Sequence, residues 1–204
     1  MYTAKFKNTL IDTILENLSN DNSFSLAVEN SLSKLKIKKS DQKRIEVYYF
    51  PNNFQSFIEE YINRTNDELS ELIKNKLPFK SLRDKIVYII GERFKIISKF
   101  KNANRKIFRF CCLPQNLVFS QKMLFKISDE IWYLTSDKSL DFNFYSKRFI
   151  LMNIYFATFI YWMNDESANF ERTKTFLKKQ INKTTIIGKY KNLLKNVIRK
   201  FNPQ

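Results

Sequence analysis

The sequence predicts an all-α fold, and two observations support that class. Residues that interrupt helices are rare, because the 204-residue chain contains only two Gly and four Pro. Apolar residues recur at helical spacing, and no stretch alternates apolar and polar positions as a half-buried strand would. With 44% hydrophobic residues, the chain can bury a full core as one domain, or as a small head on a larger body.

The first 50 residues are predicted to form a head of three short helices, over 5–18, 24–35 and 40–49, with Ser40 as the N-cap of the third. The segment 47–58 contains the step Tyr49-Phe50-Pro51. It resembles the end of the helix-turn-helix head of tetracycline-repressor-type proteins, where an aromatic-Phe-Pro step leads into a connecting helix. The resemblance implies a tetracycline-repressor-like fold with a helix-turn-helix-like head over residues 1–50.

Longer helices are predicted after the head, over 52–75, 80–100, 101–112, 115–136, 143–163 and 168–183. We expect residues 51–183 to form a multi-helix body for ligand binding and dimerisation, with a homodimer made through two of the later helices. The longest apolar run, 149–163, is shorter than the about 20 residues that cross a bilayer. It is apolar nearly all round, so it is predicted to be a buried helix.

The composition argues against an enzyme. The chain contains no His, the side chain that most often serves as general base and metal ligand. It also lacks a Gly-rich phosphate loop and a spaced Cys cluster for zinc. Carboxylate pairs such as Glu59-Glu60 fit solvated helix faces. We therefore expect no catalytic residue, no metal site and no cofactor.

Charge and Cys usage predict where the protein works. A formal net charge of +16 favours anionic partners, either phospholipid surfaces or nucleic acid. Cys111 and Cys112 are adjacent and are the only two Cys, which predicts a reducing compartment. The chain passes from Lys5 and Lys7 into an amphipathic helix without a signal-peptide pattern. We expect a bacterial cytoplasmic protein, peripheral to the inner face of the membrane.

Residues 184–204 are predicted to form a basic amphipathic C-terminal helix. The segment has apolar residues at helical spacing, basic residues on the other surface and no acidic residue, which is typical of a helix lying in a bilayer interface. The alternative is an ordinary terminal helix docked on the core. The positions predicted to contact the membrane are Ile187, Tyr190, Lys191, Leu194, Lys195, Val197, Ile198 and Phe201.

Acidic and aromatic side chains gather in residues 129–150, at a predicted helix–loop–helix corner suited to holding a partner. Asp141 is also explained as a cap of the following helix. The distinctive residues are Asp129-Glu130-Ile131-Trp132, Asp137-x-Ser139-x-Asp141-Phe142-Asn143-Phe144-Tyr145-x-Lys147-Arg148 and Thr175-Phe176-Leu177. This signature resembles the lipid-binding accessory family of coenzyme Q (ubiquinone) biosynthesis, the ninth member of the mitochondrial set and its bacterial relatives.

The resemblance implies a repressor-type pocket that binds a quinone-like isoprenoid lipid. Asn153 and Thr158 are the polar groups expected to fix its head group, and from the residues alone the aromatics there also fit a plain core. The candidate lining residues are Trp132, Met152, Tyr155, Phe156, Phe159 and Trp162. The terminal helix of the family binds membrane and guards the lipid site.

The resemblance also implies a docking patch for the di-iron hydroxylase that modifies demethoxyubiquinone. The patch residues are Asp129, Ile131, Asp141, Phe144 and Tyr145, and Phe144 replaces a usual Trp. The sequence thus predicts a ubiquinone-biosynthesis accessory protein that binds an isoprenoid quinone lipid at the membrane and presents it to the hydroxylase.

The alternative function is a tetracycline-repressor-type DNA-binding transcriptional regulator. Gln42, Lys43 and Arg44 on the third helix could read bases, whereas Asp41 and Glu46 on the same helix would oppose contact with phosphates. The basic residues near the predicted turn and recognition helix are Lys34, Lys36, Lys38, Lys39, Lys43 and Arg44.

Overall fold

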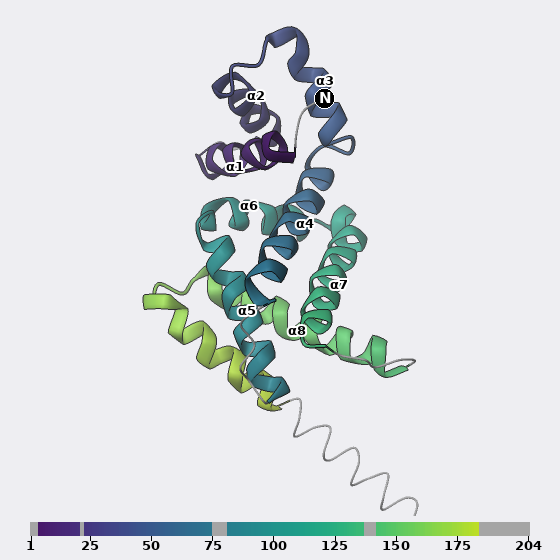
Figure 1. Cartoon of the computed structure of the whole chain (residues 1–204), viewed down its shortest axis with the longest axis vertical. Coiled ribbons are helices and arrows are strands. Elements are labelled where there is room, and N and C mark those ends of the chain that lie inside the picture. The colour runs from purple at the N-terminus through teal and green to yellow at the C-terminus, as the bar shows by residue number, and fades with distance from the viewer. Residues whose placement is uncertain (1–3, 21–22, 75–80, 137–141, 184–204) are drawn as a thin grey trace, which may run out of the picture.

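The computed structural model describes residues 4–20, 23–74, 81–136 and 142–183, and this part of the chain is all-α with no strand (Figure 1). The predicted all-α class is confirmed. The helices are α1 (Ala4–Asn20), α2 (Phe24–Lys34), α3 (Lys39–Tyr49), α4 (Phe54–Ile73), α5 (Leu82–Ser98), α6 (Lys101–Cys111), α7 (Leu117–Leu134) and α8 (Phe142–Met163), with 3-10 turns η1 (Pro114–Asn116) and η2 (Ala168–Phe170) and a last helix over residues 171–183.

Helices α1 to α3 lie together at one end of the molecule (Figure 1). The turn after α2 is closed by two backbone bonds, from the N–H of Ile37 to the carbonyl of Leu32 (3.0 Å) and from the N–H of Lys36 to that of Ser33 (2.9 Å). This pattern is a Schellman motif, with Lys36 in the left-handed region at a φ of 59°. The chain then enters α3 early, so Lys38 is its N-cap and the prediction of Ser40 as N-cap is wrong.

An aromatic cluster joins these helices to the rest of the molecule. The ring of Phe24 on α2 stacks on that of Phe54 on α4 at 4.7 Å, and Phe54 lies 4.7 Å from Phe110 on α6. Phe50 and Phe57 complete the cluster and are almost fully buried. Aromatic pairs at these distances add stabilisation beyond their buried area, so α2, α4 and α6 share one continuous core.

The long helices α4, α5, α7 and α8 form the lower part of the molecule (Figure 1). In α8, Leu151 and Trp162 are buried, but Phe149, Phe156 and Ile160 are exposed. The prediction of an apolar helix buried all round is therefore wrong for one face of α8, which the other described residues cover only in part. Among the described residues, no helix is both long and apolar enough to cross a membrane.

Asp165 holds the connection between α8 and the last helix. One carboxylate oxygen accepts from the N–H of Ser167 (2.9 Å), and the other accepts from the N–H (2.8 Å) and the hydroxyl (2.6 Å) of Thr173. Burial alone would raise the pKa of Asp165, but the hydrogen bonds from Ser167 and Thr173 outweigh it and lower that pKa to about 2. The hydrogen bonds to the carboxylate of Asp165 therefore come from neutral donors, while the Lys101 ammonium donates to the backbone carbonyl of the same residue (2.6 Å).

Candidate functional site

A cavity of about 190 Å³ lies among α4, α5, α6, α7 and α8. Most of its wall is apolar, because each of these helices turns its hydrophobic stripe toward the same interior. The lining side chains include Ile58 and Ile62 of α4, Ile97 of α5, Ile107 and Phe108 of α6, Met123 and Ile127 of α7, and Tyr155, Phe156 and Phe159 of α8.

One side of the cavity reaches solvent. Leu117 at the start of α7 is 51% exposed although it lines the cavity. Cys112, Gln121 and Phe156 are lining residues that are exposed as well. These four side chains define the mouth of the cavity.

Part of the cavity wall is both polar and buried, and we call this part the closed end. Arg93 on α5 is only 2% exposed and lines the cavity. Its Nε donates to the hydroxyl of Tyr155 (3.2 Å), and its Nη1 donates to Oδ1 of Asn66 (2.6 Å). Among the described residues, no carboxylate forms an ion pair with Arg93. The closed end therefore holds a buried positive charge beside neutral partners.

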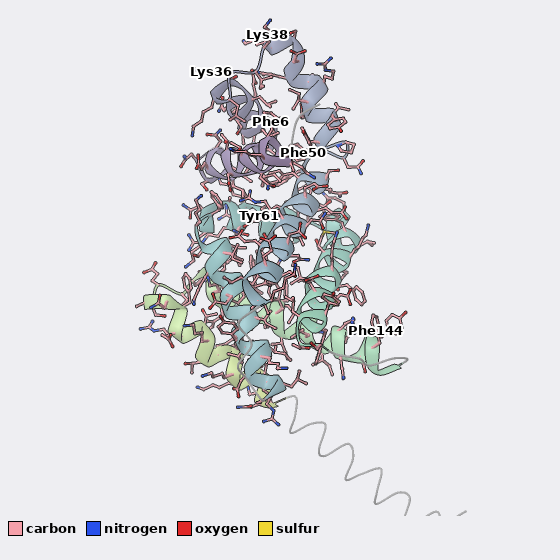
Figure 2. All side chains as sticks on the ribbon, viewed as in Figure 1. Phe6, Lys36, Lys38, Phe50, Tyr61 and Phe144 are labelled. Atoms are coloured by element: carbon pink, nitrogen blue, oxygen red, sulfur yellow. The ribbon has the colours of Figure 1, made fainter. Side chains whose placement is uncertain are left out.

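Tyr61 on α4, which is labelled in Figure 2, also lines the cavity and is buried. Its hydroxyl accepts from the side-chain amide of Asn104 on α6 (3.2 Å), and that amide also donates to the carbonyls of Ile97 and Phe100. Burial raises the pKa of Tyr61, which keeps the phenol protonated at neutral pH. The hydroxyl thus remains a hydrogen-bond donor.

Three of the six candidate lining residues, Tyr155, Phe156 and Phe159, line this cavity. The other three lie elsewhere in the core. Trp162 stacks on Phe94 at 5.3 Å, Trp132 lies under the Lys147 ammonium at 5.3 Å, and Met152 is buried.

The polar groups expected at the head group lie away from the cavity. Asn153 donates to the carbonyl of Phe149 (2.8 Å) and Thr158 to that of Ile154 (2.6 Å), so both bond within α8. Sequence reasoning missed Arg93, although it follows Ile86, Ile89 and Ile90 on the buried face of α5. A charged residue on an otherwise apolar stripe was the available signal.

The α7–α8 corner contains a second buried guanidinium. Arg148 is 5% exposed, and its Nε donates to Oδ1 of Asp129 on α7 (2.6 Å). The guanidinium also lies 3.3 Å from the ring centroid of Phe144 and donates to the carbonyl of that residue (3.1 Å). The side chain of Phe144, at the end of the molecule opposite the α2–α3 turn (Figure 2), is therefore engaged inside the corner.

The candidate docking residues differ in accessibility. Tyr145 is 65% exposed and the Asp129 side chain is 47% exposed, whereas Ile131 is fully buried and supports the corner from inside. Asp141 lies outside the described residues, as do the candidate membrane positions Ile187, Tyr190, Lys191, Leu194, Lys195, Val197, Ile198 and Phe201.

The residues expected to read DNA are engaged with their own neighbours. Lys43 pairs with Glu46 (2.9 Å) and Arg44 with Asp41 (3.3 Å) along α3. The Gln42 amide donates to the Ser33 hydroxyl and the Ile37 carbonyl. Lys36 and Lys38 are exposed at the tip of the α2–α3 turn (Figure 2).

Comparisons with known proteins agree with this arrangement. Residues 117–188, which include the α7–α8 corner, match the COQ9 family model. The chain is 29% identical over 143 residues to the ubiquinone biosynthesis protein coq9, mitochondrial, of Schizosaccharomyces pombe, covering 70% of this chain and 57% of that protein. It is 40% identical over 76 residues to the COQ9 protein of Rattus norvegicus, covering 37% of this chain and 24% of that protein.

These matches confirm the resemblance to the coenzyme Q accessory family, and the chain spans 57% or less of the length of these two relatives. The crystal structure of a TetR transcriptional regulator from Nitrosomonas europaea is similar with a TM-score of 0.68, covering 87% of this chain and 97% of that one. The predicted tetracycline-repressor-like fold is thereby confirmed. At 17% identity the likeness concerns the fold alone.

Proposed function

We propose that this protein is an accessory factor of ubiquinone biosynthesis that binds an isoprenoid quinone lipid in the α4–α8 cavity and presents it to the demethoxyubiquinone hydroxylase. The observation that carries the proposal is the cavity itself, an apolar hollow with an exposed mouth and a polar closed end. Such hollows, with few polar groups among apolar walls, are typical of ligand sites. The assignment to ubiquinone biosynthesis follows the two relatives, which are both named as ubiquinone biosynthesis proteins.

In this proposed role the protein extracts a lipid from the membrane and catalyses no reaction on it. Lifting a prenyl tail out of a bilayer exposes apolar surface to water, at about 25 cal/mol per Å². A cavity wall of Ile, Phe and Met side chains lowers that cost by covering part of the tail. The basic sequence 184–204 is proposed to hold the protein at an anionic membrane while this happens.

Mass spectrometry of an organic extract from the gently purified protein tests the proposal directly. A prenylated quinone, or a related isoprenoid, is expected at near-stoichiometric amounts. An extract without an enriched lipid would contradict the claim that the cavity carries lipid. Removal of residues 185–204 is expected to weaken sedimentation with anionic liposomes, and unchanged sedimentation would contradict membrane attachment through that segment.

Hydroxylase docking is tested best at Tyr145, because its side chain is exposed while that of Phe144 contacts Arg148. Tyr145→Ala is expected to abolish capture of the hydroxylase and to leave the lipid content unchanged. Tyr48→Ala is a matched control, since Tyr48 on α3 is also 65% exposed. Equal capture by both variants would contradict docking at the corner. Loss of lipid in Tyr145→Ala would mean that the residue is structural.

A DNA-binding regulator remains the second candidate, because Lys36 and Lys38 leave a basic tip on the α2–α3 turn. The ion pairs along α3 oppose this function, since they neutralise two of the basic residues that would meet phosphate. Binding to a preferred DNA site, weakening steeply with salt, would favour the regulator. Binding without sequence preference would reflect only the net charge of the chain.

A further inference from the structure

Among the described residues, no carboxylate lies close enough to Arg93 to form an ion pair with its guanidinium. A guanidinium this deeply buried loses most of its hydration, and such a charge is costly unless it is paired. Glu130 on α7 is attracted to the Arg93 guanidinium but does not form a hydrogen bond or an ion pair with it. Burial raises the pKa of Glu130, and the attraction to Arg93 opposes that rise. The direct partners of Arg93 are therefore neutral, and Glu130 attracts the guanidinium without bonding to it.

The free hydrogen-bonding groups at the closed end are donors. A guanidinium has five N–H groups. Arg93 uses one on Tyr155 and one on Asn66, which leaves N–H groups on Nη1 and Nη2 without a partner among the described residues. The hydroxyls of Tyr61 and Tyr155 each accept one bond and can each donate one more. A ligand group that only accepts hydrogen bonds suits this end best.

The size of the cavity limits what can sit at that end. A cavity of about 150 Å³ holds one benzene ring. The cavity here, at about 190 Å³, holds a head group or one ring but not a long chain as well. The rest of a lipid must leave through the mouth, past Leu117 and Phe156, whose exposed apolar surfaces suit a hydrocarbon chain.

We infer that the closed end of the cavity is a carboxylate site, in which Arg93 binds the acidic head group of a single-chain lipid whose tail leaves through the mouth. The inference goes beyond the proposed function: the cavity is the same, but a quinone ring has no carboxylate, so the acidic single-chain lipid is a second class of ligand for it. A carboxylate is planar and accepts two parallel N–H bonds, which the free groups on Nη1 and Nη2 can supply. The two tyrosine hydroxyls can donate to its remaining lone pairs.

Calorimetric titration with dodecanoate and with methyl dodecanoate tests the inference, because the two ligands share a chain and differ in charge. At about 0.15 M salt, which screens surface attraction, dodecanoate is expected to bind at least about tenfold more tightly, as a hydrogen bond to a charged group predicts. Arg93→Met should remove this preference. Arg148→Met, which alters the other buried guanidinium, should retain it.

The outcomes separate the inference from the proposed function. Equal binding of both ligands by the parent protein would overturn the carboxylate site while leaving a lipid cavity. Binding of neither would overturn both claims. If Arg93→Met does not fold, the parent protein alone decides: dodecylammonium is expected to bind at least about tenfold more weakly than dodecanoate. Equal or tighter binding of dodecylammonium would overturn the inference.

Discussion

The closed end of the cavity and the α7–α8 corner each bury a guanidinium, yet the two sites treat it differently. At the corner, Arg148 is neutralised by Asp129 and covered by the ring of Phe144. In the cavity, Arg93 has only the neutral acceptors Asn66 and Tyr155. The ion-paired Arg148 stabilises the fold, whereas Arg93, which has no ion-pair partner and lines the cavity, is available to bind a ligand. Burial alone therefore does not tell which charged residue is functional.

The largest effect is expected from breaking the corner. Asp129→Ala should leave the Arg148 guanidinium buried without its carboxylate, at a cost of about 3 kcal/mol in the free energy of unfolding. Urea unfolding followed by circular dichroism measures the change. Glu171→Gln is the control, because Glu171 forms an ion pair with Lys174 at the surface, where water and salt screen the attraction. Similar losses in both variants would contradict the framework role of the corner.

Asp165 extends the comparison to a buried carboxylate whose two oxygens accept hydrogen bonds from neutral donors, whereas Arg93 keeps N–H groups without a partner among the described residues. Because its pKa is lowered to about 2 from an ordinary 3.8, it stabilises the fold above about pH 4, and this stability is lost as the pH falls toward 2. Asp165→Asn should cost about 2 kcal/mol at pH 7 and little at pH 2. Glu166→Gln, at the exposed neighbour, should change neither value.

A pH-independent difference between the parent protein and Asp165→Asn would contradict this assignment. The expected measurement is urea unfolding at several pH values between 2 and 7, with the two free-energy curves converging at low pH. Convergence identifies the carboxylate, and not the shape of the side chain, as the stabilising feature.

The smallest change in stability is expected at Glu130, the half-buried carboxylate that is attracted to Arg93. Its raised pKa means that the folded state binds this proton more tightly than the unfolded chain does, so stability falls as the pH rises above about 4.5. Glu130→Gln should remove that fall and stabilise the protein at pH 7 by less than about 1 kcal/mol. Destabilisation at pH 7 would instead identify Glu130 as the counter-ion of Arg93.

The helices could be predicted from sequence because their periodicity is local. The helix predicted over 52–75 corresponds to α4 at Phe54–Ile73, and the helix predicted over 101–112 corresponds to α6 at Lys101–Cys111. The start of α3 was predicted at the wrong residue because it depends on the left-handed conformation of Lys36. That conformation is usual for Gly or Asn at the end of a helix, so a Lys does not predict it.

The cavity could be predicted only in part. The aromatic residues on α8 predicted an apolar interior. Which of them line the cavity depends on how five helices pack together, and the sequence does not show this. Trp162 fills space against Phe94, while Phe159, three residues earlier, lines the cavity. The polar end escaped prediction because it is assembled from α4, α5, α6 and α8, which are distant in sequence.

The most direct test of the difference between the two guanidiniums is urea unfolding of Arg93→Met and Arg148→Met in lipid-extracted protein. Arg148→Met should lose about 2 kcal/mol, because an ion pair and a cation–π contact disappear. Arg93→Met should stay within about 1 kcal/mol of the parent, because removing an unpaired buried charge offsets the hydrogen bonds lost at Asn66 and Tyr155. A loss in Arg93→Met equal to or larger than that in Arg148→Met would contradict the account, since Arg93 would then be part of the framework.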